Sequence, residues 1–244
     1  MSPEELSRMI NEKEGTMSHE REVSLAFPAL FRKVYVWMTM ALAITGLTAY
    51  VVINSESILF SLYSTPAIMW VMIIAELALV FFISSRIQKI SITTATILFV
   101  LYAVINGLTL APILLIYTGA SVAKVFFITA GTFAAMAFYG YTTKSDLSKM
   151  GKIAIMALIG VIIATVVNLF MHSSTLDMII CYGGVLIFVG LTAWDTQKIK
   201  NMLAQCDEPN EQAQKIALLG SLSLYLDFIN VFIYLLRILG TSRD

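Results

Sequence analysis

Three acidic residues lie inside long apolar stretches of this sequence: Glu76, Asp195 and Asp227. A carboxylate near the middle of a membrane costs roughly 2.5–3.5 kcal/mol on insertion scales, so it normally faces the interior of a helix bundle or water. Helical spacing places Asn230 and Tyr234 on the same stripe as Asp227, while leucines and phenylalanines fill the other faces. We therefore expect these polar side chains to perform the chemistry of the protein.

Paired carboxylates suit proton- and cation-linked chemistry. Two carboxylates held together at low dielectric constant cannot both ionise easily, and such a pair titrates closer to neutral pH than a free carboxylate. Calcium prefers about six to eight oxygen ligands. Asp195 and Asp227, with Asn230, Tyr234, backbone carbonyls and water, could supply a weak, transient calcium site. Simpler interpretations stay open: Asp195 as an acid wetted at a helix end, and Asp227 as the acceptor of a structural hydrogen bond.

The apolar stretches themselves exclude an ordinary soluble domain. Of 244 residues, 58% are apolar and 13% are charged, and the mean hydropathy is +0.82. In soluble domains roughly 45–50% of residues are apolar and about 25% are charged. The formal net charge is zero, which argues against a nucleic-acid partner. The predicted fold class is an all-α, polytopic membrane protein with a seven-helix transmembrane domain over residues 34–240. Its spans, each near the about 20 residues that cross a bilayer, are 34–53, 66–84, 91–117, 120–141, 152–171, 175–197 and 212–238.

Residues 1–33 precede the first span and hold no apolar stretch of the signal-peptide type. We expect this cytoplasmic head to be largely disordered or to form a short amphipathic helix. Most of the 16 basic residues fall in the head and in loops such as those near Lys89 and Lys200, whereas loops 54–65 and 172–174 contain none. The positive-inside rule then predicts a cytoplasmic N-terminus and a C-terminus outside. The expected location is the cell (inner) membrane of a bacterium, or an endomembrane of a eukaryote.

Enzymatic motifs are not found in the sequence. No phosphate-binding loop, dinucleotide fingerprint or zinc motif occurs, so we expect neither enzymatic activity nor a cofactor. An intramembrane aspartyl hydrolase, in which Asp195 and Asp227 would activate water, is the least favoured alternative. Neither aspartate follows the Gly-x-Gly-Asp pattern that such proteases use.

Three short segments carry a family resemblance: residues 106–113 (NGLTLAPI), 194–197 (WDTQ) and 223–230 (SLYLDFIN). Together they resemble the transmembrane Bax inhibitor motif family in a bacterial-type form. The resemblance implies a seven-helix fold with the last span at its centre. It also implies a pH-sensitive calcium leak.

The resemblance also implies roles for individual residues. In that family two aspartates share a proton, and an arginine of the second span helps to lock the closed state. By motif, the aspartates correspond to Asp195 and Asp227, the arginine to Arg86 and a secondary acid to Glu76. Asn106, within the first segment, is a further secondary polar candidate. Arg86 also has a simpler interpretation as a snorkelling, positive-inside anchor.

The leading functional hypothesis is a leak channel in the lipid bilayer that passes calcium ions and is gated by protons. The alternative is a non-conducting regulator, which would bind a membrane protease or a cell-death protein through residues 1–33 and the charged loop 207–211. Calcium flux into liposomes that contain only this protein distinguishes the two hypotheses.

Overall fold

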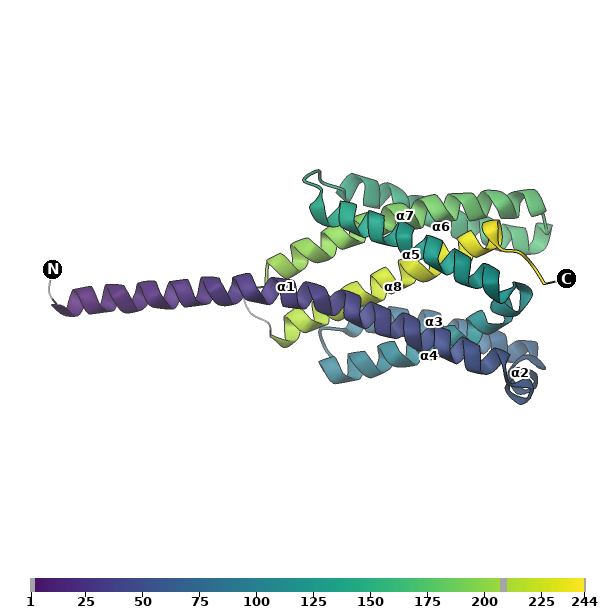
Figure 1. The fold of residues 1–244 in the computed structure, drawn as a ribbon, viewed down its shortest axis with the longest axis horizontal. Helices are drawn as coiled ribbons and strands as arrows, with labels where there is room; N and C mark the ends of the chain where they lie inside the picture. Colours follow the sequence, from purple (N-terminus) through teal and green to yellow (C-terminus); the bar gives the residue numbers. More distant parts are fainter. Residues whose placement is uncertain (1–2, 207–209, 244) are drawn as a thin grey trace.

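The computed structural model describes residues 3–206 and 210–243, and these fold into eight helices without a β-sheet. Seven of the helices are long and apolar enough to cross a membrane, which confirms the predicted all-α, polytopic fold (Figure 1). The helices are α1 (Pro3–Ile53), α2 (Glu56–Tyr63), α3 (Pro66–Arg86), α4 (Ile92–Ile116), α5 (Gly119–Thr142), α6 (Ser148–Met171), α7 (Ser174–Ala204) and α8 (Glu211–Leu239).

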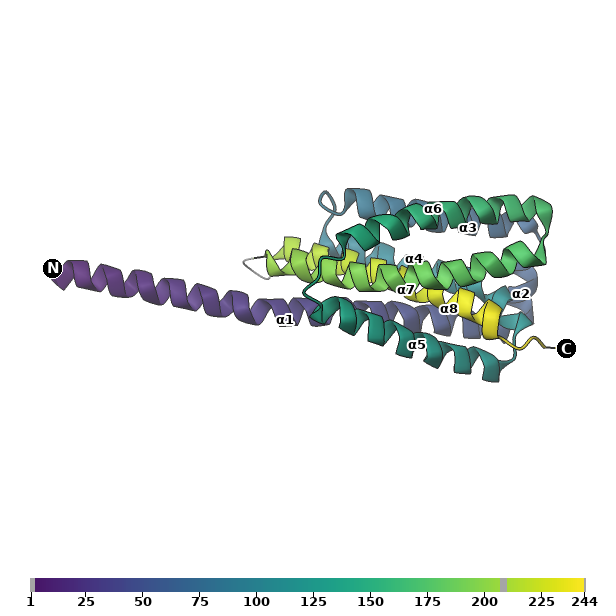
Figure 2. The same ribbon diagram turned by 90° about the horizontal axis from the view of Figure 1, so that it is seen from above.

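The first helix differs from the sequence-based expectation. α1 is continuous from Pro3 to Ile53, so the backbone has no break at residue 33 between the expected head and the first span. Pro28 lies within it and has no N–H to donate, yet the helix continues on both sides. The N-terminal part of α1 projects well beyond the bundle (Figure 2). Its placement on the cytoplasmic side stays a prediction.

The connection after α1 contains the short helix α2. Hydrophobic length did not predict it, because its eight residues are too few to cross a membrane. The hydroxyl of Tyr63 at its end donates to the carbonyl of Leu108 in α4. α7 is also longer than predicted and continues past residue 197. Its last turns stay helical because Ile199 and Leu203 are buried in the main core, which compensates for the polar residues between them.

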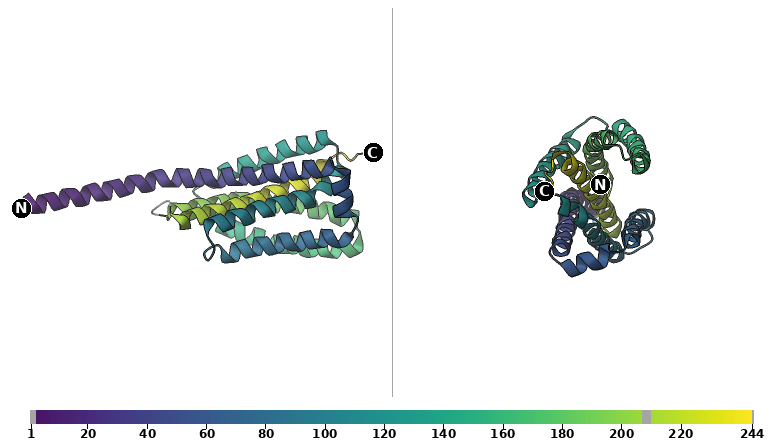
Figure 3. Two further views of the ribbon diagram at one scale, coloured as in Figure 1. Left: turned by 90° about the horizontal axis from the view of Figure 1, so that it is seen from below. Right: turned by 90° about the vertical axis from the view of Figure 1, so that its right-hand side faces the viewer.

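α8 lies at the centre of the bundle. It packs against α1, α4, α5 and α7 (Figure 3), and 67% of its most apolar segment is buried, compared with 6% for α6. Small and apolar side chains such as Ala217, Leu224 and Val231 fill its contacts. The expected central position of the last span is therefore confirmed. α3 and α6 are peripheral, since α3 packs mainly on α4 and α6 on α7.

Candidate functional site: an aspartate pair between α7 and α8

Asp227 lies in the middle of α8 and is buried, with 4% of its surface exposed. Its Oδ2 atom has no hydrogen-bond partner within the residues that the structure describes. Leaving a buried polar atom unsatisfied costs about 1–3 kcal/mol, and more for a charged group. Such a cost is typical of a functional position rather than of a group that only stabilises the fold.

Asp195 is the acidic neighbour of Asp227. It lies on α7, is half-buried, and is close enough for its charge to act on the Asp227 carboxylate. α7 and α8 form the most extensive helix pair in the bundle, and this packing places Asp195 near Asp227. The two like charges therefore lie near each other where little water can screen them. A role of the two residues as a proton-sharing pair stays a prediction.

Lys198 is the nearby cation that sequence reasoning missed. Its charge acts on Asp195 one turn earlier on α7, and its Nζ atom lies 4.9 Å from the centre of the Trp194 ring. In the sequence analysis Lys198 served only as one of the basic residues that predict the orientation in the membrane. The i,i+3 spacing from Asp195 was the signal that could have identified it, because residues three apart on a helix are neighbours.

Two close helix contacts fix the backbone around Asp195. Gly140 of α5 lies directly against the backbone of Ala193, and Gly151 of α6 lies against the ring of Trp194. A Cβ atom at either glycine would overlap with these atoms, so both contacts require glycine. α5 and α6 therefore hold residues 193–194 in place and, with them, the aspartate that follows.

Arg86 does not reach the aspartate pair in this structure. It is exposed at the end of α3, and within the described residues the ion pairs join Glu211 to Lys215 and Asp177 to Arg237. The reason is the position of α3, which packs on α4 at the periphery rather than on α7 or α8. The role of Arg86 as a lock stays a prediction.

Glu76 and Asn106 belong to a second polar cluster, separate from the aspartate pair. Glu76 Oε1 accepts hydrogen bonds from Thr109 Oγ1 at 2.6 Å and from Asn106 Nδ2 at 3.4 Å. The hydroxyl of Tyr225 donates to Asn106 Oδ1 at 2.9 Å and lies 2.7 Å from the hydroxyl of Thr45. The cluster thus links α3, α4, α8 and α1. Sequence reasoning missed Tyr225 and Thr45, although a buried tyrosine hydroxyl normally needs a partner.

The other two polar residues on the Asp227 stripe bond or pack locally. Asn230 Nδ2 donates to the carbonyl of Leu226 at 2.8 Å, a back-bond within the helix. The ring of Tyr234 packs against Gly184 and lies 6.0 Å, centre to centre, from the ring of Phe188. In this arrangement neither side chain is hydrogen-bonded to Asp227.

The site does not form a tight metal cage. Within residues 3–206 and 210–243, no group of three or more His, Cys, Asp and Glu side chains could hold a metal ion. Two carboxylates supply at most four of the about six to eight oxygens that calcium prefers. The donor set therefore suits brief contact with a passing hydrated cation better than storage of a bound one.

Two further acidic features lie away from the pair. Asp177, at the start of α7, accepts a hydrogen bond from Arg237 near the end of α8. This ion pair joins α7 and α8 at the opposite end of α7 from Asp195. The charged loop expected to contact a partner spans 207–211, and residues 207–209 lie outside those that the structure describes.

Comparison with known proteins gives consistent matches over the membrane domain. The sequence pattern of the family described as "Inhibitor of apoptosis-promoting Bax1" matches residues 28–244. The inner membrane protein YbhL of Escherichia coli K12 is 48% identical over 212 residues, which cover 86% of this chain and 91% of YbhL. An uncharacterised protein of Borreliella burgdorferi is 43% identical over 228 residues, which cover 93% of this chain and 98% of the relative. A membrane protein of Streptococcus pyogenes serotype M1 is 37% identical over 214 residues, or 87% and 92% of the two chains.

Proposed function

This chain belongs to the Bax inhibitor-1 family of multi-pass membrane proteins, and we propose that it is a pH-dependent leak channel for calcium. The observation that supports the proposal is the buried carboxylate of Asp227, which has an unpartnered oxygen and Asp195 beside it. Such a pair can bind a proton, and its oxygens are of the kind that calcium prefers. Calcium is the transported ion here, not a resident cofactor.

In the proposed mechanism the two aspartates share one proton, and that proton sets the charge of the pair. When the proton leaves, the doubly charged pair attracts a cation strongly. Arg86 is the cation of the protein that would compete with calcium for this position, because its guanidinium can hold a carboxylate with two hydrogen bonds. The closed state then requires the end of α3 to move toward α7 and α8.

The peripheral position of α3 supports this movement. Apart from the short α2, α3 packs mainly on α4, and it exposes large side chains such as Phe81 and Leu77. Adding a proton to the pair weakens its attraction for Arg86, so the calcium leak should rise as the pH falls from about 8 toward about 6.

The test is calcium flux into liposomes that contain only the purified protein, measured with an enclosed calcium dye between pH 5 and pH 8. We expect a flux above that of protein-free liposomes, with a clear dependence on pH. An ionophore control calibrates the dye at each pH. Folded, reconstituted protein that passes no calcium at any of these pH values would refute the channel proposal.

A non-conducting regulator is the second candidate, and the projection of α1 beyond the bundle favours it (Figure 1). A long helix outside the membrane domain offers a surface for a protein partner. The same liposome assay separates the two candidates, because a regulator without its partner should pass no calcium. The expected orientation, with the N-terminus in the cytoplasm, is part of both proposals.

A further inference from the structure

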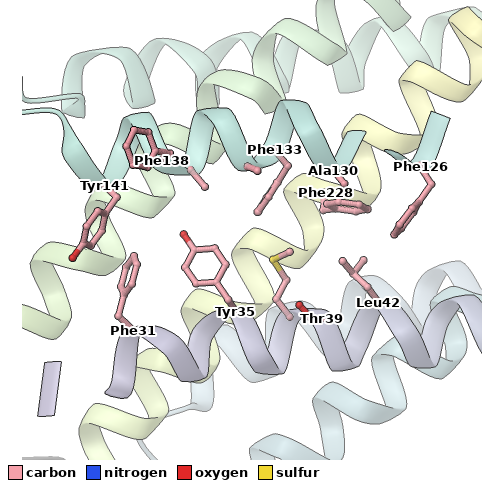
Figure 4. Close-up of a pocket in the computed structure, with 13 residues that line it drawn as sticks. Phe31, Tyr35, Thr39, Leu42, Phe126, Ala130, Phe133, Phe138, Tyr141 and Phe228 are labelled. Atoms are coloured by element: carbon pink, nitrogen blue, oxygen red, sulfur yellow. The ribbon is translucent and has the colours of Figure 1, made fainter. Parts of the chain in front are cut away.

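A groove runs between α1 and α5, with α8 as its floor (Figure 4). Its volume is about 520 Å³, within the range of about 300–1,000 Å³ that is common for ligand pockets. The side chains that line it are almost entirely apolar or aromatic, and Figure 4 shows those of α1 and α5 facing each other across the opening.

The groove is about as long as half of a bilayer's hydrocarbon core is thick. At one end the rings of Phe31 and Tyr141 meet, with centres 4.9 Å apart. The other end of the groove is lined by Leu42, Phe126 and Phe228, and the two rings lie 5.5 Å apart, centre to centre. The same three residues also line a second cavity between these helices. Leu42 lies eleven positions after Phe31 on α1, which is about 16 Å at 1.5 Å per residue. Half of a typical hydrocarbon core is about 15 Å thick.

Small side chains on α5 keep the groove open. Ala130, Ala134 and Ala137 lie at helical spacing and line it opposite Tyr35 and Thr39 of α1. α1 and α5 both pack on α8, and α8 does not fill the space between them. In a membrane this opening faces lipid, and an apolar groove left empty would forfeit van der Waals contacts along its whole lining. Hydrocarbon is therefore the chemistry that fits.

Positive charge lies at the Phe31–Tyr141 end of the groove. Arg32 is exposed there and lines a smaller depression that shares Tyr35 and Thr39 with the groove. Lys200 of α7 is held nearby, since its Nζ atom donates to the carbonyl of Tyr141 at 2.7 Å and lies 5.0 Å from the centre of its ring. These cations stand where the headgroup of a lipid in the groove would lie, and they complement a phosphate.

We propose that the groove between α1 and α5 is a binding site for one acyl chain of an anionic phospholipid from the adjacent leaflet, with the lipid phosphate beside Arg32 and Lys200. The groove is about as long as one leaflet of the hydrocarbon core, so its length matches an acyl chain from that leaflet. The site is independent of calcium permeation, so the proposed function can fail without affecting it.

Photochemical crosslinking in the full-length protein tests this site. The protein is reconstituted into phosphatidylcholine vesicles with a small fraction of phosphatidylglycerol that carries a diazirine on one acyl chain. After irradiation, mass spectrometry quantifies the adducts on peptides from α5 and from α6, the helix most exposed to bulk lipid. We expect α5 adducts to concentrate at groove positions and to be displaced by unlabelled phosphatidylglycerol more readily than α6 adducts. Equal displacement at both helices would mean bulk lipid only and would overturn the proposal.

Two matched pairs of variants make the test specific. Ala134→Trp fills the groove, whereas Ala135→Trp adds the same side chain to an exposed neighbouring position that does not line it. We expect several-fold fewer α5 adducts for Ala134→Trp alone, and equal yields from both variants would contradict the site. Arg32→Gln should lower phosphatidylglycerol labelling about fivefold, which corresponds to about 1 kcal/mol. Lys33 is exposed and lies outside the groove lining, so Lys33→Gln should leave phosphatidylglycerol labelling unchanged. Equal losses of labelling in the two variants would exclude a specific headgroup contact at Arg32.

If Ala134→Trp fails to fold, the displacement experiment on the unmodified protein still decides the question. Size-exclusion profiles and thermal midpoints identify such a failure before labelling begins. Unlabelled phosphatidylcholine provides the last comparison. Displacement of α5 adducts by phosphatidylcholine as effective as that by phosphatidylglycerol would overturn the anionic-headgroup part of the proposal.

Discussion

Replacing Asp227 with asparagine should make the protein more stable and at the same time abolish most of its calcium flux. The substitution keeps the shape of the side chain and removes its charge. In the structure Oδ2 of Asp227 is buried without a partner, and the introduced amide N–H can donate to the Asp195 carboxylate nearby. Relief of one unsatisfied buried group is worth about 1–3 kcal/mol, so the thermal midpoint in detergent should rise.

The flux assay measures the other half of this prediction. Asparagine offers calcium one neutral carbonyl oxygen in place of a charged carboxylate, so Asp227→Asn should lose most of the flux even though the pair keeps one negative charge. With one titrating group left, the pair can no longer share a proton, so the small residual flux should not respond to pH between 5 and 8. Asp177→Asn is the matched control, because Asp177 is partly exposed and its partner is Arg237 at the other end of the bundle. The control should keep both flux and pH response, with a stability change of about 0–1 kcal/mol. Normal calcium flux with a normal pH profile in Asp227→Asn would refute the shared-proton gate.

Three other predictions address the remaining parts of the mechanism. Asp195→Asn should also flatten the pH profile of the flux, and two aspartates that act independently would instead each retain a separate profile. Arg86→Ala should raise the basal leak per inserted protein, whereas Lys89→Ala in the next loop should not; equal fluxes would leave Arg86 as an anchor. In a background without native cysteines, a cysteine at Ser57 should react with an impermeant thiol reagent outside the cell and one at Ser148 should not. Labelling of Ser148 in intact cells would reverse the predicted topology.

The helices that cross the membrane could be predicted from the sequence because hydrophobic length alone determines them. The same criterion fails where helix formation depends on other causes. α2 is too short for a span, and the last turns of α7 are too polar, although Ile199 and Leu203 bury the side that faces the core. The backbone of α1 also continues as a helix through the position where the apolar pattern begins, because a change in polarity does not by itself end a helix.

The site was predictable residue by residue but not as an arrangement. Each of Glu76, Asn106, Asp195 and Asp227 stood out as a polar residue in an apolar span. Which of them meet depends on how each helix is rotated about its axis, and hydrophobic pattern determines that poorly when a helix is apolar on all sides. The family resemblance supplied the aspartate pair. The hydrogen bonds of Glu76 with Thr109 and Asn106 became visible only in the structure.

The central position of α8 gives these two polar clusters a physical connection. Residues two apart on a helix point about 200° away from each other, so Tyr225 and Asp227 face opposite sides of α8. Tyr225 bonds to α4 beside α1, while Asp227 faces Asp195 on α7. A rotation of α8 that relieved repulsion between the aspartates would therefore strain the hydrogen bond from Tyr225 to Asn106. The buried cluster around Glu76 thus opposes movement of α8 at the aspartate pair.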